Sequence, residues 1–580
     1  MIVKNESHII AETLDTLARH IDTWVIVDTG SEDGTQDLIS SHMAGLGIPG
    51  ELHERPWVNF GHNRSEALTL AQGHADYIWV FDADDTIGGN LQFGELGRDL
   101  YQLRFGQAAE VYWRPGLYRD GRPFRYEGVL HEYIVMDEDF TYDRLEGDYY
   151  IESRRLGDRN KDQKQKYARD AAILLAEHER NPDDPRTVFY LAQSYYDLGD
   201  FESARKWYQH RVDMGEWDEE VYFAMYRVGE AMSKLGMPWP QVQDAYLRAW
   251  EFRPQRAEAM YAIAYRYRLD QRYWLGYLFA KHAAEIPFPT EDTLFVSSAI
   301  HKWLSTDEYA LCASWIDKKE EAFTIWRGLL YRPDLPTGDR TRMAANLDVC
   351  APVLIESAGR YPAELARNLH AGPSDAQIVV TLIAGPDPAA TELTLNSFLN
   401  SCNDIARIGR FLALDAGLPA EDRAALLERY EFLDFTGPPA SDGLGAQLAH
   451  LRGEVRGRFW LNLGQGWQFF CPENFITRLI AVLEAEPEVF QVAVNATDAT
   501  ELCGLSAPED TASRAPDAGR YVLTHQIAYG PAMFDTERLD RAGGVRNTDP
   551  DPVAALGRRA AAANMRTASL DEVMCIKASQ

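Results

Sequence analysis

The hydrophobic pattern of the chain changes twice along its length, and these two changes divide it into parts that cannot share one fold. In the first part, residues 1–158, short apolar runs alternate with segments whose apolar residues recur at helical spacing. Only the helical spacing is found from residue 159, and the alternation returns from residue 373. A chain of 580 residues is also too long for a single core. The sequence therefore predicts two α/β regions with a helical region between them.

In the first α/β region, two apolar runs end in carboxylates. "TWVIVDTG" ends in Asp28, and the apolar residues 77–81 of "DYIWVFDADD" are followed by three aspartates in the range 82–85. Fully apolar strands are typical of a largely parallel sheet that is buried on both faces. Ligands of such sheets bind beyond the carboxyl ends of the strands. We therefore expect Asp28 and the later aspartates to lie in one crevice.

The helical region contains a repeated pattern. "FYLAQSYYDLGDFESARKWY" has small residues and a Leu-Gly turn at 198–199, and a second Leu-Gly follows at 235–236. A third, degenerate copy ends at Pro287. This pattern is typical of tetratricopeptide (TPR) helix–turn–helix repeats, which stack and leave a concave face. The alternative is a generic helical linker domain.

Composition and charge exclude several classes of protein. The chain has 58 Lys and Arg against 89 Asp and Glu, a formal net charge of -31, which argues against nucleic acid or an anionic membrane as the main partner. No run approaches the ~18 apolar residues of a membrane helix, and the N-terminus does not resemble a signal peptide. None of the six cysteines forms a CxxC pair, which favours buried thiols in a reducing compartment. We expect a soluble, cytoplasmic bacterial protein without a membrane span.

Four motifs in a fixed order carry a resemblance to a known family. The order "MIVKNES…IDTWVIVDTGSEDGT…FGHNRSEAL…DYIWVFDADD", within residues 1–155, resembles the family 2 glycosyltransferases of the GT-A fold. The resemblance implies a Rossmann-like nucleotide-diphospho-sugar transferase domain. It also implies a nucleoside-diphosphate sugar as donor, with a UDP-sugar as the first choice, and Mn²⁺ or Mg²⁺ as cofactor. Carboxylates at a strand end suit such a cation, which offsets the charge of a diphosphate leaving group.

The resemblance assigns roles to five residues. By it, Asp84 of the DxD motif would ligate the metal, and Asp82 would contact the ribose or assist the metal. Asp28 would contact the base and ribose, Arg64 would lie near the nucleotide, and Glu6 would line the same pocket. The alternatives are an acidic turn that caps a strand and, for Arg64, a solvated charge on a helix.

The base that deprotonates the acceptor must come from a later segment. "RYEGVLHEYI" offers Glu132 as the catalytic base and His131 as a further metal ligand, although a histidine packed at a strand edge is the alternative. Many relatives carry an H-x-G turn just before the helical region, whereas this chain has "YYIESRRLGDRNKD". Either His131 completes the metal site, or Arg154 and Arg155 help to neutralise the diphosphate.

The second α/β region repeats the order of elements without the carboxylates. Its second strand ends in Asp415, but the strand comparable to "FDADD" is "WLNLGQGW", with Asn462 and Gly464 at the matching positions. A neutral amide and a glycine hold a divalent ion poorly. We expect a GT-A-like domain without catalysis, used for acceptor binding, assembly or packing; an unrelated α/β domain is the alternative.

Together these patterns predict four segments: a GT-A catalytic domain (1–158), a TPR-like helical domain (159–335), a helical linker (336–372) and a GT-A-like domain lacking a DxD motif (373–580). The predicted function is metal-dependent, inverting transfer of a sugar to a protein or peptide, which the TPR-like domain would bind, or to a cell-surface glycan. The alternative is a TPR scaffold with a vestigial transferase domain. A nucleotidyltransferase is disfavoured, since we find no Gly-rich phosphate loop near the N-terminus.

Overall fold

The chain forms two compact units in the computed structural model, and each is described by itself. The first comprises Met1–Ile263 with His282–Lys302, and the second comprises Ala264–Lys281 with Trp303–Gln580. The structure describes residues 1–106, 112–154, 156, 162–356, 359–369, 375–437, 443–496, 506–546 and 551–578. The predicted boundaries at 158/159 and 372/373, and the predicted phosphate-neutralising Arg155, lie outside these residues.

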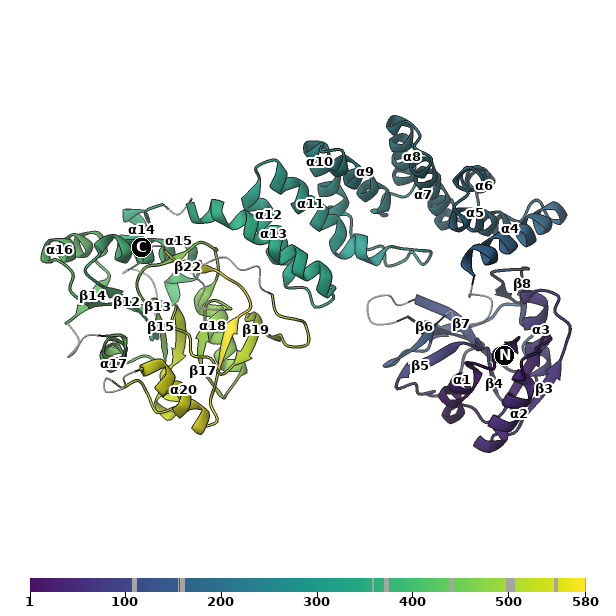
Figure 1. Ribbon diagram of the computed structural model, residues 1–580, viewed down its shortest axis with the longest axis horizontal. Coiled ribbons are helices and arrows are strands. Elements are labelled where there is room, and N and C mark those ends of the chain that lie inside the picture. Colours follow the sequence, from purple (N-terminus) through teal and green to yellow (C-terminus); the bar gives the residue numbers. More distant parts are fainter. Residues whose placement is uncertain are drawn as a thin grey trace. The chain divides into compact units, whose positions relative to one another are not determined.

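A three-stranded parallel sheet begins the first unit (Figure 1, purple). Its strands follow the order β1 (Ile2–Val3), β2 (Trp24–Asp28) and β3 (Gly50–Glu54). Helices α1 (Ile10–Leu17) and α2 (Thr35–Leu46) bury Ile10 and Ile39 in a core shared with Val3 and Ile26. The sequence analysis missed β3, because "GELHE" contains a single apolar residue among five.

The predicted third strand of this sheet belongs instead to a second, mixed sheet. β4 (Tyr77–Trp79) is shorter than the predicted run 77–81 and pairs antiparallel with β7. The prediction of one largely parallel sheet is therefore wrong, because an apolar run predicts a buried strand but does not encode its partner. The sheet has the order β4-β7-β6-β11-β5, with β10 beside β6. Its other strands are β5 (Asp85–Gly89), β6 (Leu100–Phe105), β7 (Tyr112–Arg119), β10 (Tyr142–Arg144) and β11 (Tyr149–Ser153).

Two further elements complete the N-terminal region. Helix α3 (Phe60–Leu70) carries the "HNRSEAL" motif and is capped by Asn59, whose side chain accepts a hydrogen bond from the His62 N–H. β8 (Arg125–Glu127) and β9 (Tyr133–Val135) form an antiparallel pair. The residues between β8 and β9 include the predicted His131 and Glu132.

The middle of the chain is built from helical hairpins, as the sequence predicts (Figure 1, blue to teal). The two Leu-Gly turns join α5 to α6 and α7 to α8, and Gly199 and Gly236 adopt φ values of 86° and 68°, which favour glycine. The helices are α4 (Gln163–Arg180), α5 (Pro185–Leu198), α6 (Phe201–Met214), α7 (Asp218–Lys234), α8 (Trp239–Phe252), α9 (Glu258–Leu269), α10 (Tyr273–Glu285), α11 (Ser305–Trp315), α12 (Lys319–Leu330), α13 (Thr337–Glu356) and α14 (Ala363–Asn368).

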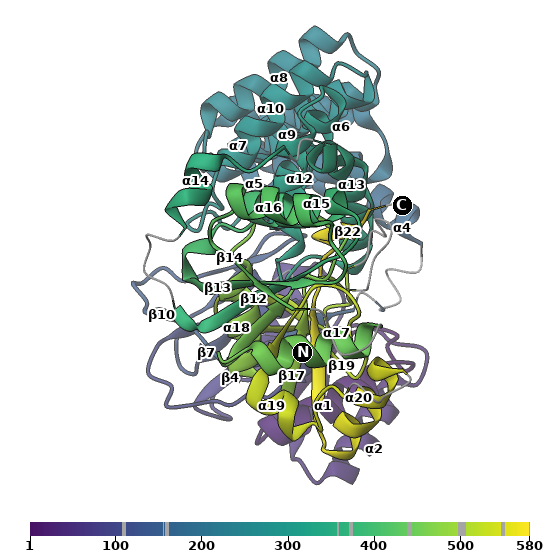
Figure 2. The same cartoon turned by 90° about the vertical axis from the view of Figure 1, so that its left-hand side faces the viewer.

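A nine-stranded sheet dominates the C-terminal region (Figure 2, green to yellow). Its order is β14-β13-β12-β15-β20-β17-β21-β19-β18. The strands of this region are β12 (Asp375–Ala384), β13 (Ile408–Asp415), β14 (Leu433–Thr436), β15 (Phe459–Asn462), β16 (Trp467–Phe469), β17 (Val489–Ala493), β18 (Ser513–Ala515), β19 (Gly519–Thr524), β20 (Ala532–Asp535), β21 (Arg566–Leu570) and β22 (Cys575–Lys577). The helices are α15 (Pro388–Ser401), α16 (Ala420–Arg429), α17 (Leu444–Glu454), α18 (Phe475–Ala485), α19 (Thr536–Arg541) and α20 (Pro552–Ala562).

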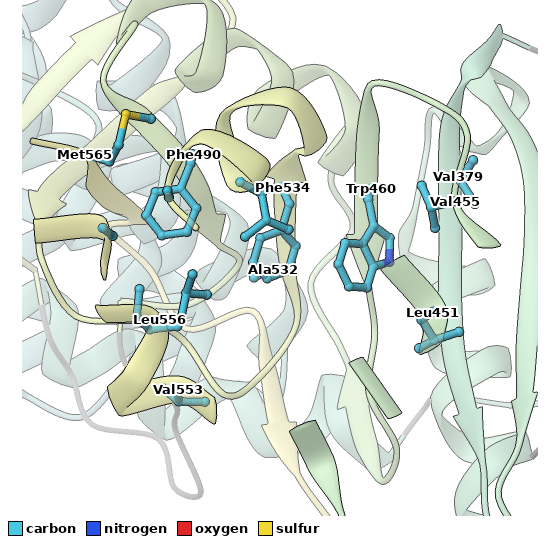
Figure 3. Close-up of a cluster of buried hydrophobic side chains, with 14 of the residues drawn as sticks. Val379, Leu451, Val455, Trp460, Phe490, Ala532, Phe534, Val553, Leu556 and Met565 are labelled. Carbon is cyan, nitrogen blue, oxygen red and sulfur yellow. The ribbon is translucent and has the colours of Figure 1, made fainter. Parts of the chain in front are cut away.

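Aromatic and aliphatic side chains fill the core on one face of this sheet. Trp460 of β15 and Phe534 of β20 stack with ring centroids 4.9 Å apart (Figure 3). Val379, Leu451 and Val455 lie beside Trp460. The five cysteines of the described residues are buried free thiols, as predicted, and Cys503 lies outside that part. Among the described helices, none combines the length and the apolar character needed to cross a membrane.

Candidate active site

Asp82, the predicted metal ligand Asp84 and Asp85 lie where β4 leads into β5. Hydrogen bonds to the backbone hold this connection. The Thr13 hydroxyl of α1 donates to the carbonyl of Ala83 (2.9 Å), and the Arg154 Nε donates to the carbonyl of Asp84 (2.9 Å). These contacts come from α1 and from the residue after β11. The aspartates are therefore fixed by elements on both sides.

Asp82 is held between two arginines. Arg64 Nη2 of α3 donates to its Oδ1 at 2.5 Å, and Arg114 Nη1 of β7 donates to its Oδ2 at 3.1 Å. Burial alone would raise the pKa of Asp82, but Arg64 and Arg114 hold it well below its ordinary value. Arg64 also pairs through Nε with Glu132 Oε1 at 2.7 Å. Three residues predicted from separate motifs, Arg64, Asp82 and Glu132, thus form one buried network.

Arg114 is the member of this network that the sequence analysis did not find. It lies inside β7, in "YWRPGLYR", where the flanking aromatic residues give the pattern of an ordinary strand. Its guanidinium also lies over the ring of Phe105, 5.4 Å from the centroid. The sequence did offer one indication of its role, because a charged residue in the middle of a half-buried strand is unusual unless it is paired.

Asp85 has a different environment from Asp82. Its side chain is 1% exposed, and within the part of the chain that the structure describes its Oδ1 is buried without a hydrogen-bond partner. Burial, followed by the charges of Asp82 and Asp84, raises the pKa of Asp85 to about 7. Negative charge therefore exceeds positive charge around this carboxylate.

The aspartates fit a cation that is shared with a substrate rather than one enclosed by protein. In the described ranges, no three His, Cys, Asp or Glu side chains gather as a cation site. Mg²⁺, however, is usually held by one or two carboxylates together with substrate phosphates. The carboxylate of Asp84 and the unpartnered oxygen of Asp85 are donors of that kind. Metal binding by Asp84 stays a prediction.

Asp28, at the end of β2, organises the turn that follows. Its Oδ1 accepts hydrogen bonds from the backbone N–H groups of Gly30 and Ser31, both at 2.9 Å, and from Gln36 Nε2 at 3.1 Å. Gly30 has a φ of 103°, which a residue with a side chain adopts only under strain. The Asp28 Oδ2 is buried and has no hydrogen-bond partner among the described residues. It is therefore an acceptor available to a hydroxyl or N–H of a ligand.

Glu6 lies against the same turn. The Asn5 N–H donates to Ser31 Oγ (2.8 Å), and the Glu6 N–H donates to Thr35 Oγ1 (2.9 Å). The segment after β1 is thus joined to the loop after β2. That Glu6 and Asp28 line one ligand pocket stays a prediction. That this pocket also includes Asp82 stays a prediction.

His131 contacts the first helical hairpin. Its ring stacks on that of Tyr190 in α5, with centroids 3.9 Å apart and an angle of 5° between the planes. Arg186 Nε donates to its carbonyl at 3.2 Å. This stacking fixes the loop that presents the neighbouring Glu132 to Arg64. A role for His131 as a metal ligand stays a prediction.

A cavity of the first unit lies beside this network. It has a volume of about 340 Å³ and is lined between β2 and β4 mainly by apolar side chains, among them Leu14, Trp24 and Trp79. Arg64 and Asp82 also line it. The cavity therefore combines apolar walls with the charged side chains of Arg64 and Asp82.

Comparison with known proteins identifies a family for part of the chain. Residues 1–96 match the family model described as "Glycosyl transferase family 2". The match includes Glu6, Asp28, Arg64, Asp82 and Asp84. It ends before Arg114 and Glu132. The N-terminal part of the chain is therefore similar to this family over those residues. No curated protein sequence matches the chain.

Solved structures resemble parts of the chain only distantly. The mannosyltransferase PcManGT from Pyrobaculum calidifontis, solved in complex with GDP-Man and Mn²⁺, is 14% identical, with a TM-score of 0.27 over 42% of this chain and 68% of that one. YrrB, a TPR protein with an unusual peptide-binding site, is 14% identical, with a TM-score of 0.24 over 32% and 84%. MamA is 16% identical, with a TM-score of 0.23 over 29% and 91%. Scores this low carry no argument about function.

Proposed function

We propose that the protein is a metal-dependent glycosyltransferase that moves a sugar from a nucleoside-diphosphate sugar to an acceptor hydroxyl with inversion. The observation that carries the proposal is the network of ion pairs among Arg64, Asp82, Arg114 and Glu132. Its first two members lie within the region that matches the family model. A network of this kind supplies both a carboxylate at the acceptor side and cationic groups at the side of a diphosphate.

In this proposal each group has one task. Asp84 would hold Mn²⁺ or Mg²⁺, and such a cation would supply positive charge near the leaving diphosphate. Asp28 Oδ2 accepts a hydrogen bond from the nucleoside, and Arg64 and Arg114 orient Asp82. Glu132 accepts the proton of the acceptor hydroxyl. The oxygen of that hydroxyl bonds to the anomeric carbon of the donor as the bond from this carbon to the diphosphate breaks.

The donor and acceptor are proposed by class. We propose a UDP-sugar as donor and, as acceptor, a protein or peptide that the helical hairpins bind. A cell-surface glycan is the other acceptor class. We also propose a cytoplasmic location, in line with the buried free thiols of the described residues.

We further propose that the C-terminal domain is related to the N-terminal one and does not catalyse. Two local likenesses support the relation. The parallel order β14-β13-β12 matches β3-β2-β1. Asp415 Oδ1 accepts from the N–H groups of Gly417 and Leu418, both at 3.1 Å, as Asp28 does in its own turn. Gly417 has a φ of 101°, close to that of Gly30.

Donor hydrolysis tests the catalytic proposal. Release of nucleoside diphosphate from a panel of UDP- and GDP-sugars should require Mn²⁺ or Mg²⁺. It should fall by about 100-fold or more in Asp84→Asn. Asp143→Asn, which changes a carboxylate with 60% of its side chain exposed, is the matched control and should retain the wild-type rate. Absence of cation-dependent hydrolysis with every donor would contradict the proposal and favour a scaffold.

A further inference from the structure

The loop between β8 and β9 carries the proposed base Glu132 and is joined closely to helix α3. The Gly61 N–H donates to the carbonyl of Gly128 at 3.1 Å. The two backbones approach so closely that a Cβ added to Gly61 would lie 2.5 Å from that carbonyl oxygen. One turn further along α3, Arg64 pairs with Glu132 at 2.7 Å. The backbone contact therefore sets the distance between the helix and the loop that form this ion pair.

The first helical hairpin, formed by α4 and α5, packs against the same loop. Leu130, two residues before Glu132, is 7% exposed. Its side chain belongs to a buried cluster with Ala171 and Leu174 of α4 and Leu191 of α5. The loop thus binds α3 through its backbone and the hairpin through an apolar side chain, and all of these residues lie within the first unit.

A second contact with the hairpin acts on the residue directly before Glu132. His131 has a φ of 52°, in the left-handed region, which a residue with a side chain keeps only where its surroundings enforce it. Its ring lies 3.9 Å from that of Tyr190 with the planes nearly parallel, and its carbonyl accepts from Arg186 Nε at 3.2 Å. Both contacts come from α5. The hairpin therefore maintains a backbone conformation of His131 that sets the direction in which the chain enters Glu132.

Arg186 contacts the residues on both sides of Glu132. Besides its hydrogen bond to the residue before it, its guanidinium lies over the ring of Tyr133, 4.9 Å from the centroid. Arg186 is itself held by Glu220 of α7 at 3.7 Å. Glu220 pairs in turn with Arg211 of α6 at 2.9 Å, and the side chains of this second pair are at most 4% exposed. The contact with the loop is thus anchored on a buried ion pair of the next hairpin.

We propose that His131, Tyr190 and Arg186 are positioning residues for the proposed base. They hold the Glu132 carboxylate where it can accept the proton of the attacking hydroxyl or water. The inference rests on the proposed function, and it makes the first helical hairpin a part of the catalytic apparatus. A metal ligand would need a ring nitrogen of His131, whereas a positioning residue needs the flat face of its ring.

Replacements of His131 separate these two needs. His131→Phe keeps a flat ring, whereas His131→Asn removes the ring and still tolerates the left-handed backbone. In cation-dependent hydrolysis of the donor by the full-length protein, His131→Asn should lower kcat about tenfold or more, and His131→Phe should stay within about threefold of the wild type. The donor KM should not change, because a misplaced base slows the chemical step and leaves donor binding intact. His210→Asn, the same change at an exposed position on α6, is the matched control.

Replacements on the other side of the stack test whether the two rings act together. Tyr190→Leu should lower kcat about as much as His131→Asn does, and Tyr190→Phe should not. The double variant His131→Asn/Tyr190→Leu should lose little more than either single variant, because each of them already breaks the same stack. Hydrogen exchange of residues 128–135 should be faster in His131→Asn than in His131→Phe, in parallel with the loss of kcat.

The outcomes that would overturn the inference differ from those that would overturn the proposed function. If His131→Phe and His131→Asn lose the same activity, or if raised Mn²⁺ restores both, the ring nitrogens matter and the inference is wrong. Faster exchange of the loop with unchanged kcat, or fully additive losses in the double variant, would also refute it and leave the catalytic proposal standing. Absence of cation-dependent hydrolysis in the wild type would refute the proposed function and the inference with it.

Discussion

Replacing Glu258 by glutamine should loosen the segment 292–301, which follows α10. The carboxylate is 3% exposed and accepts hydrogen bonds from Arg256, from the Tyr222 hydroxyl (3.2 Å) and from the Ser297 N–H (3.0 Å). Burial raises its pKa, but hydrogen bonds from His301 and Arg256 and the charge of Arg256 lower it further, from 4.5 to about 2. The change therefore removes the group that joins α7, α9 and the segment.

The size of the effect follows from that pKa. Because one pH unit corresponds to about 1.4 kcal/mol, the carboxylate of Glu258 contributes about 3 kcal/mol at pH 7. A carboxyl whose pKa is lower in the folded than in the unfolded state contributes stability that is fully present above its unfolded-state pKa. This stability is lost as pH falls through its folded-state pKa. At pH 3.5 the contribution should be about 2 kcal/mol, and below pH 2 it should disappear.

Hydrogen exchange measured by mass spectrometry is the suitable assay, because unfolding of a chain with two units is not a single two-state event. Peptides covering 292–301 should exchange faster in Glu258→Gln at pH 7, with a smaller difference at pH 3.5. Glu251→Gln, an exposed site on α8, is the control. Unchanged exchange at pH 7, or an equal difference at both pH values, would refute the reasoning.

Two predictions concern the candidate active site. Because the pKa of Asp85 is raised to about 7, its ionised carboxylate lowers the stability of the fold above pH 7 but not below about pH 4. In EDTA, the Tm of Asp85→Asn should therefore exceed that of the wild type at pH 8 and equal it at pH 4. A higher wild-type Tm at pH 8 would be inconsistent with this. Arg114→Gln should raise the donor KM about tenfold in steady-state kinetics and change stability by less than about 1 kcal/mol, because Arg64 still pairs with Asp82 and Arg114 is 39% exposed. An unchanged KM would exclude Arg114 from the donor side.

The sequence predicted the elements of both α/β regions better than their pairing. Apolar runs located β2 and β4, because a strand buried on both faces needs apolar side chains on both. The Leu-Gly pairs located the turns after α5 and α7, because only glycine adopts the required φ readily. The partner of β4 was not predictable, since pairing with β7 depends on contacts across a gap of many residues. β3 was missed because one side chain, Leu52, carries its hydrophobic signal.

Site residues that lie in recognisable sequence motifs could be predicted. Site residues whose role depends on a contact made only in the folded chain could not. The resemblance identified Arg64 and Asp82, and the need for a base in a later segment identified Glu132. The structure joins the three through ion pairs. Arg114 could not be assigned because its role arises from β7 passing beside Asp82, which only the folded chain shows. The stacking of His131 on Tyr190 depends likewise on how the first helical hairpin packs.

The two α/β regions differ in what their strand-end polar groups leave unsatisfied, and this difference decides where we place catalysis. In the C-terminal region, the Oδ1 of Asn462 accepts from the Thr381 hydroxyl at 3.0 Å, and that hydroxyl accepts from Trp460 Nε1 at 2.8 Å. This chain of neutral groups is closed and carries no charge for a ligand to offset. In the N-terminal region, the buried carboxylate of Asp85 keeps an unpaired oxygen among the described residues beside two further aspartates. Burying such charge without compensation costs several kcal/mol. We therefore propose that a proton or a cationic ligand neutralises this carboxylate, and we place catalysis in the N-terminal region.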